Sequence, residues 1–191
     1  MSQRVVVAGV GNVLHQDDGF GVAVAQKMLD HPMLPPEVTV LDIGIGGMTL
    51  IQALEEPCNL LIIVDAYQRG GRPGDLYLLE PQVPDMTGLS LQERCDYFAD
   101  THYATPMRAL AFSRSIGRLP PLIRIIGCEP VEADDIGIGL NPPVAAAVPS
   151  ACALVKTVIE EYLVSIHHGL HGKLSSTGLI GADMNGLGHQ S

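Results

Sequence analysis

Two adjacent acids, Asp17 and Asp18, have the residue types and the setting to do chemistry. They follow an apolar run at residues 5–8 and a turn that contains Gly9 and Gly11. The run predicts a buried parallel strand, and the glycines allow a sharp turn at its carboxyl end. The acids then fall at the start of a helix, whose dipole favours ionised carboxylates. Adjacent carboxylates at this end of a strand could bind a cation or accept protons.

Other interpretations of this turn carry less weight. For Asp17 the interpretation as a helix cap stays open. For Asp18 the interpretation as a solvated acid of the first turn is disfavoured, because a cap needs one side chain and two acids stand side by side here. Dinucleotide binding is disfavoured because Leu14 stands where G-x-G-x-x-G requires its third glycine. The carboxylates would also repel a pyrophosphate. We therefore interpret the turn as a candidate active site.

A third acid, Asp65, closes the clearest buried strand of the chain, an apolar run that begins at Leu60. Because the carboxyl ends of parallel strands meet at one edge of a sheet, we expect Asp18 and Asp65 to share a rim. An imidazole commonly completes a metal site of this kind, and His102, at the entrance to a helix after a long loop, is the best placed of the seven histidines. His15 is the next candidate.

The elements that must position these residues alternate between strands and helices. Further strands are predicted at residues 38–42, 75–80 and 122–128, and helices at 48–54, from Thr101 through Phe112, and from Asn141 through Leu163, where Pro149 should produce a kink or mark a late start. The link before 75–80 is short, which indicates antiparallel pairing. The predicted fold is an α/β three-layer sandwich, with a mostly parallel twisted sheet of about five strands, one of them antiparallel, flanked by helices on both faces.

Length and composition predict one domain and a tail. Residues 1–166 are expected to form a single α/β domain with a substantial core. Residues 167–191 are rich in Gly, His and Ser with little to bury, and are expected to be flexible. The histidines of this tail could bind a transition metal, but a flexible tail is the favoured interpretation.

Charge and cysteine usage exclude several classes of function. The formal net charge is -10, with 11 Lys and Arg residues, which argues against nucleic acid or anionic lipid as partner and favours a basic partner segment. The chain enters its first strand directly after Arg4 and no stretch suggests a membrane span, so we expect a cytoplasmic protein. The four cysteines form no C-x-x-C pair and are expected to be free thiols.

Short motifs from Val5 to Leu163 together resemble one known family. They are Gly9-x-Gly11-Asn12-x-Leu14-x-x-Asp17-Asp18-Gly19-x-Gly21, Val64-Asp65-Ala66, Thr101-His102 and Gly127-x-Glu129-Pro130. This pattern closely resembles the hydrogenase maturation endopeptidases. The resemblance implies a protease that removes the C-terminal extension from the large-subunit precursor of a nickel-iron hydrogenase after nickel insertion.

The resemblance also implies which residues act. It implies a metal-contacting trio of Asp18, Asp65 and His102, nickel that is supplied by the substrate, and a substrate-binding loop that contains Gly44, Gly46 and Gly47. Two residues depart from the family pattern: the second acid of the first motif, commonly Glu, is Asp18 here, and the Gly44–Gly47 loop lacks a threonine often seen there.

The chemistry can also be argued from the residues. No G-x-S-x-G elbow is present and no cysteine stands in a recognisable nucleophile context beside His102, so a covalent acyl-enzyme lacks support. We expect Asp18, Asp65 and His102 to sense the nickel of the substrate, while Asp17 or Asp65 assists water attack. An aspartic-type and a metal-assisted mechanism both stay open, as does a permanently bound metal.

Two other classes of function stay open. One is a generic small metallohydrolase with its own tightly bound zinc. The other is a noncatalytic module that binds a nucleotide or a partner protein, for which Asp18 and Asp65 would be dispensable.

Overall fold

A five-stranded sheet forms the middle layer of the part of the chain that the computed structural model describes, which is residues 3–30, 34–90, 92–93, 105–131 and 136–167. Its strands, in spatial order, are β2 (Val38–Gly44), β1 (Val5–Val10), β3 (Leu60–Ala66), β5 (Leu122–Cys128) and β4 (Leu76–Leu79). β4 runs antiparallel to β5, and the other neighbours are parallel. The predicted mostly parallel sheet with one antiparallel strand is confirmed.

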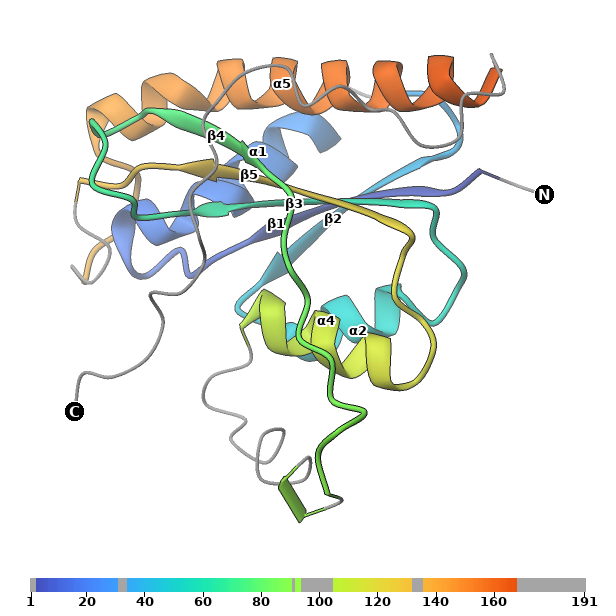
Figure 1. The fold of residues 1–191 in the computed structure, drawn as a ribbon. Helices are drawn as coiled ribbons and strands as arrows, with labels where there is room; N and C mark the ends of the chain where they lie inside the picture. The colour runs from blue at the N-terminus through green and yellow to red at the C-terminus, as the bar shows by residue number, and fades with distance from the viewer. Residues whose placement is uncertain (1–2, 31–33, 91, 94–104, 132–135, 168–191) are drawn as a thin grey trace.

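Helices cover both faces of this sheet (Figure 1). The helical elements are η1 (Gln16–Gly19), α1 (Phe20–Leu29), α2 (Gly47–Ala53), α4 (Pro106–Ser115) and α5 (Pro142–His167). α1 and α5 lie on one face, and α2 and α4 lie on the other (Figure 1). The predicted three-layer architecture is therefore confirmed.

The central strands are apolar throughout because both of their faces are covered. In β1, Val5 and Val7 pack with Phe20 of α1 and with α5, whereas Val6 and Ala8 pack with Leu50 and Leu110 of the opposite layer. Successive side chains of a strand point to opposite faces, so a strand that is buried on both sides needs an unbroken apolar run.

Two helix starts are set by residues near prolines. Thr105 caps α4, since its side chain accepts a hydrogen bond from the Arg108 amide and Pro106 occupies the first turn. α4 therefore begins later than the predicted start at Thr101, which lies outside the described residues, because a proline with its fixed φ and missing N–H suits the first turn immediately after Thr105. α5 begins at Pro142, directly after Asn141 as expected, and continues through Pro149, so the late start is wrong.

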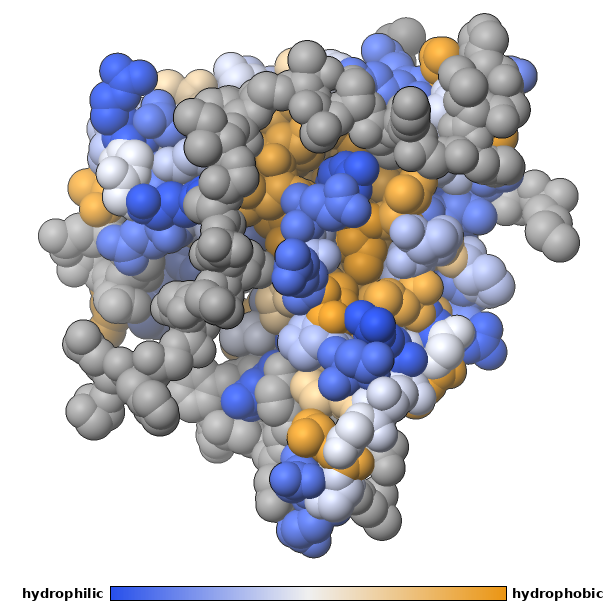
Figure 2. Space-filling view, in the orientation of Figure 1, coloured by the Kyte–Doolittle hydropathy of each residue, from blue (hydrophilic) through white to orange (hydrophobic). Residues whose placement is uncertain are grey.

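α5 also corrects the expectation that no segment could span a membrane. By length and composition alone this helix is long and apolar enough to do so, with a mean hydropathy of 1.5 in its most apolar window. The same test is passed by core helices, and α5 packs its buried side chains against α1 and the sheet. On the face in Figure 2, apolar side chains are interspersed with hydrophilic ones.

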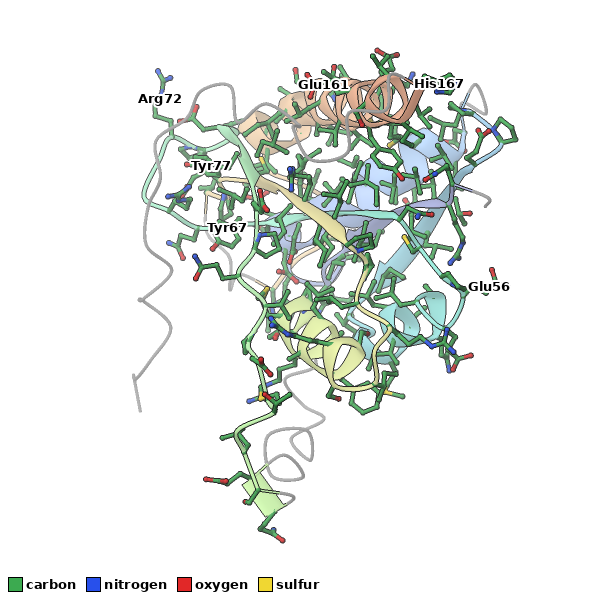
Figure 3. All side chains as sticks on the ribbon, turned by 45° about the vertical axis from the view of Figure 1, so that its right-hand side comes forward. Glu56, Tyr67, Arg72, Tyr77, Glu161 and His167 are labelled. Carbon is green, nitrogen blue, oxygen red and sulfur yellow. The ribbon has the colours of Figure 1, made fainter. Side chains whose placement is uncertain are left out.

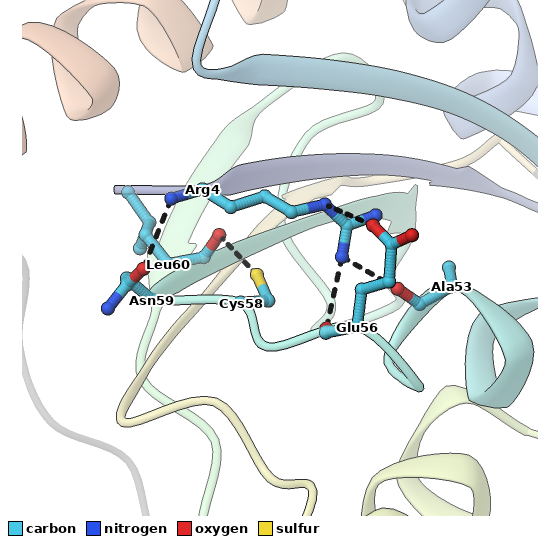
Figure 4. A network of polar contacts seen from close by, with 6 residues as sticks. All are labelled: Arg4, Ala53, Glu56, Cys58, Asn59 and Leu60. Atoms are coloured by element: carbon cyan, nitrogen blue, oxygen red, sulfur yellow. Dashed lines mark hydrogen bonds and ion pairs between the residues drawn. The ribbon is translucent and has the colours of Figure 1, made fainter. Parts of the chain in front are cut away.

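The amino-terminal edge of the sheet is held by Arg4. Its guanidinium donates to the carbonyl oxygens of Ala53 and Glu56, at 3.0 and 3.1 Å, and its amide donates to Asn59 Oδ1 (Figure 4). These bonds tie the start of β1 to the segment that leads into β3. The opposite, carboxyl edge is free to carry loops.

Candidate functional site

The glycines of the first motif let α1 approach the ends of β1 and β3 closely. A Cβ on Gly9 would clash with the Gly21 carbonyl, and one on Gly21 would clash with the Val64 carbonyl. Gly11 has a φ of 134°, and a Cβ there would clash with the Asp18 carbonyl. The motif therefore packs the acid-bearing turn directly against the carboxyl ends of the two central strands.

The structure brings Asp18 and Asp65 together at this edge. Asp18 lies in η1, where its Oδ2 accepts a hydrogen bond from the Asn12 amide at 2.6 Å. Asp65 lies near the end of β3 and is half-buried. Burial, and then the negative charge of Asp18, raise the pKa of Asp65 to about 7, while a hydrogen bond with the Ala66 backbone opposes this shift. A positive or proton-donating group between these carboxylates would relieve the repulsion between their negative charges.

Asp17, by contrast, is fully buried and has a different set of partners. Its Oδ1 accepts a hydrogen bond from the Asn141 amide at 2.7 Å, and its Oδ2 accepts from the Val131 amide at 2.9 Å and from Asn141 Nδ2 at 3.0 Å. It is not a helix cap, since the N-cap position of η1 is His15. The Asp17 carboxylate joins η1 to the loop after β5 and to the start of α5.

Glu129, to which the sequence analysis assigned no role, organises the neighbouring loop. It is 3% exposed, and it accepts hydrogen bonds from the amides of Arg69 and Gly70 and from Tyr77 Oη at 2.7 Å. Burial alone would raise the pKa of Glu129, but the bonds from Tyr77 and the backbone amides outweigh it and hold that pKa below its usual value. The signal for this role in the sequence is the position of Glu129 between a predicted buried strand and Pro130.

This loop follows β3 and lies at the same end of the sheet as the acids. Figure 3 shows Tyr67, Arg72 and Tyr77 at one end of the sheet and Glu56 at the other. The Tyr67 amide donates to the Cys128 carbonyl at 2.8 Å, so the loops after β3 and β5 are joined. Together with Glu129, these bonds give the edge beside Asp65 a rigid support.

The glycine loop after β2 also lies on this rim. β2 ends at Gly44, whose carbonyl accepts a hydrogen bond from the Gly11 amide at 3.0 Å, and Gly44 has a φ of 57°. Gly46 and Gly47 lead into α2. The predicted substrate loop is therefore a neighbour of the acid-bearing turn.

The predicted histidine ligand, His102, lies outside the described residues, as does His31. His15 lies one residue before η1, on the same turn as Asp18. Within the residues that the structure describes, no group of three His, Cys, Asp or Glu side chains could hold a metal ion. A metal ion bound by the two carboxylates would need further ligands, such as an imidazole or groups of a substrate.

The described thiols are unsuited to nucleophilic catalysis. Burial raises the pKa of Cys58 to about 11 and that of Cys128 to about 12, so both stay protonated at neutral pH. Burial also raises the pKa of Cys152. None of the described cysteines is activated, and Cys95 lies outside the described residues.

Comparisons with known proteins agree on one family. A family model described as hydrogenase maturation protease matches residues 22–158. The hydrogenase expression/formation protein HupD of Bradyrhizobium diazoefficiens is 32% identical over 164 residues, which span 85% of this chain and 81% of that protein. The solved structure of the hydrogenase maturating endopeptidase HybD from Escherichia coli matches with a TM-score of 0.67 and 27% identity, over 84% of this chain and 94% of that one. A hydrogenase 2 maturation peptidase from a Thaumarchaeota archaeon matches with a TM-score of 0.57 and 33% identity, over 88% and 100%.

Proposed function

This chain belongs to the hydrogenase maturation protease family, and we propose on that premise that it removes the C-terminal extension of a nickel-iron hydrogenase large-subunit precursor after nickel insertion. The observation that carries the proposal is the pair of carboxylates, Asp18 and Asp65, at the carboxyl edge of the parallel sheet. The glycine-packed turn holds one acid, and the end of β3 holds the other.

In this proposal the carboxylates recognise nickel as part of the substrate. Asp18, Asp65 and His102 contact the nickel that the precursor carries, because carboxylate and imidazole are both ligands that nickel accepts. The like charges of Asp18 and Asp65 repel each other, and a divalent cation between them removes that repulsion. A precursor without nickel lacks this contact and is not cleaved.

Asp65 is the acid that we assign to water activation, in preference to Asp17. Both oxygens of Asp17 already accept hydrogen bonds in a fully buried position. Asp65 takes a proton from water, the water oxygen attacks the peptide carbonyl carbon, the C–N bond breaks, and the departing nitrogen receives the proton. Gly44, Gly46 and Gly47 line the adjacent rim and are assigned to substrate binding.

The precursor is the proposed partner, and the cytoplasm is the proposed location. The net charge of -10 favours a basic surface on the precursor. Cell fractionation followed by immunoblotting tests the location, and recovery of this protein with the membrane fraction would contradict it.

The deciding experiment compares nickel-loaded and nickel-free large-subunit precursors. Each is incubated with the purified protein, and mass spectrometry follows the loss of the C-terminal peptide. Cleavage of the loaded form alone supports the proposal. Cleavage of both forms, or of generic peptides, indicates a generic metallohydrolase, and cleavage of neither indicates a binding module.

The same assay tests the site. Asp18→Asn and Asp65→Asn each remove a charge with little change in volume, so we expect both variants to fold and neither to process the precursor. Asp30→Asn is the matched control, because Asp30 is exposed at the far end of α1. Full processing by the Asp18 or Asp65 variant would remove that residue from the site.

A further inference from the structure

Gly137 joins residues 136–138 to the turn before η1 through an isolated parallel bridge, and two backbone groups of this segment point outward. The Gly137 amide donates to the Leu14 carbonyl at 2.9 Å, and the Gln16 amide donates to the Gly137 carbonyl at 3.0 Å, which makes a parallel bridge between His15 and Gly137. The C=O and N–H of one planar trans peptide point in opposite directions. The Ile136 C=O and the Ile138 N–H therefore face away from Leu14 and Gln16, and no hydrogen bond among the described residues uses them.

The side chains on either side of Gly137 are apolar and exposed. Ile136 is 86% exposed and Ile138 is 88% exposed. A Cβ on Gly137 would lie 2.7 Å from Gln16 Nε2, so the Gln16 side chain covers that face of the segment. Exposed apolar side chains on an unpaired edge are a typical template for another strand.

This edge is continuous with the candidate site. The paired segment leads directly into η1, and the Asp18 amide donates to the His15 carbonyl at 3.0 Å. Two further apolar side chains of the same turn, Val13 and Leu14, are 48% and 57% exposed. A chain that pairs with residues 136–138 would therefore lie beside the turn that carries Asp18.

We propose that the C-terminal extension of the precursor docks on Ile136–Ile138 as an added strand. This inference rests on the proposed function and deepens it. The Ile136 C=O and the Ile138 N–H bond to the main chain of the substrate, and the two isoleucine side chains contact apolar substrate residues. The extended conformation exposes the scissile peptide bond to the carboxylates. Main-chain pairing gives affinity, while the nickel contact gives selectivity for the loaded precursor.

A backbone variant and a side-chain variant separate the two kinds of contact. Ile138→Pro removes the outward N–H, whereas Ile138→Ala keeps it and removes apolar contact. On the nickel-loaded precursor we expect Ile138→Pro to lower kcat/KM about tenfold or more, mainly through KM, and Ile138→Ala to lower it by about threefold. Ile116→Ala is the control, since Ile116 is exposed after α4. Thermal melting confirms that each variant folds.

The outcomes distinguish this inference from the proposed function. If the parent protein cleaves and Ile138→Pro cleaves at the parental rate, the docking edge is wrong while the proposed function stands. If the parent does not cleave, the proposed function fails, and hydrogen exchange with the same precursor decides the docking edge. Slower exchange at the Ile138 amide supports docking there, and slower exchange confined to β4 overturns it.

Discussion

The amide of Asn141 donates to Asp17 Oδ1 at 2.7 Å, and Asn141 Nδ2 donates to Asp17 Oδ2 at 3.0 Å, across 124 positions of the chain. Asp18, the next residue, accepts from Asn12 instead and interacts with Asp65. The tight turn of η1 directs consecutive side chains to different sides. One acid therefore supports the fold, and its neighbour is free for the proposed chemistry.

Asp17→Asn is expected to destabilise the protein by about 2–4 kcal/mol, because the amide NH₂ of the new side chain opposes buried N–H donors. Chemical denaturation measures the loss. Asp18→Asn, one position along, should keep the parental stability within about 1 kcal/mol. Equal stabilities of the Asp17 and Asp18 variants would contradict the division of roles.

Asp65→Asn is expected to raise stability at pH 8. The pKa of Asp65 is raised from 3.8 to about 7 in the folded state, so folding favours its protonated form. The stabilisation that Asp65 offers is complete below pH 3.8 and is lost as pH rises through 7. The difference in the free energy of unfolding, variant minus parent, should be roughly 1–2 kcal/mol larger at pH 8 than at pH 5. Denaturation at both pH values tests this, and a constant difference would refute it.

Glu129→Gln is expected to lower stability by about 1–2 kcal/mol and to loosen the loop at residues 69–71, because the amide NH₂ of the new side chain opposes the N–H donors of the loop. The folded-state pKa of Glu129 is lowered, so its contribution is present above the ordinary value of 4.5 and is lost as pH falls below it. Between pH 7 and pH 3, the difference in melting temperature between the parent and the variant should shrink as the pH falls. Glu56→Gln is the control, since the Glu56 side chain is 81% exposed.

His102→Ala is expected to weaken binding of nickel or cadmium more than His15→Ala or His31→Ala does, because His102 alone is assigned to the metal-contacting trio. Calorimetric titration of each variant with either metal measures the affinities. We expect a loss of about tenfold or more for the His102 variant. Equal affinities for the three variants would identify His102 as the wrong imidazole.

Truncation after His167 is expected to leave the melting temperature within about 2 °C of the parent, since residues 168–191 carry few apolar side chains to bury. Truncation after Val158 is the contrasting control, because it also removes Ile159 and Tyr162, which are buried in the core. A large loss of stability in the first truncation would show that the tail docks on the domain.

The architecture and the shared sheet edge of Asp18 and Asp65 follow from local patterns in the sequence. The strands β1 and β3 are readable because a strand buried on both faces needs an apolar run, which is a local pattern. Their parallel order then places Asp18 and Asp65 on one edge. The first-turn position of Pro142 is also local, because proline suits the start of a helix.

The different surroundings of Asp17 and Asp18 become visible only in the folded chain. Asp17 and Asp18 are chemically identical neighbours, and the difference between them lies in Asn141 and Val131, which are distant in the chain. Glu129 likewise gains its role from the amides of Arg69 and Gly70, and Gly137 gains its bridge from Leu14 and Gln16. Hydrogen bonds between distant segments leave no periodic trace in the sequence, so these roles become visible only when the loops at the carboxyl edge of the sheet are brought together.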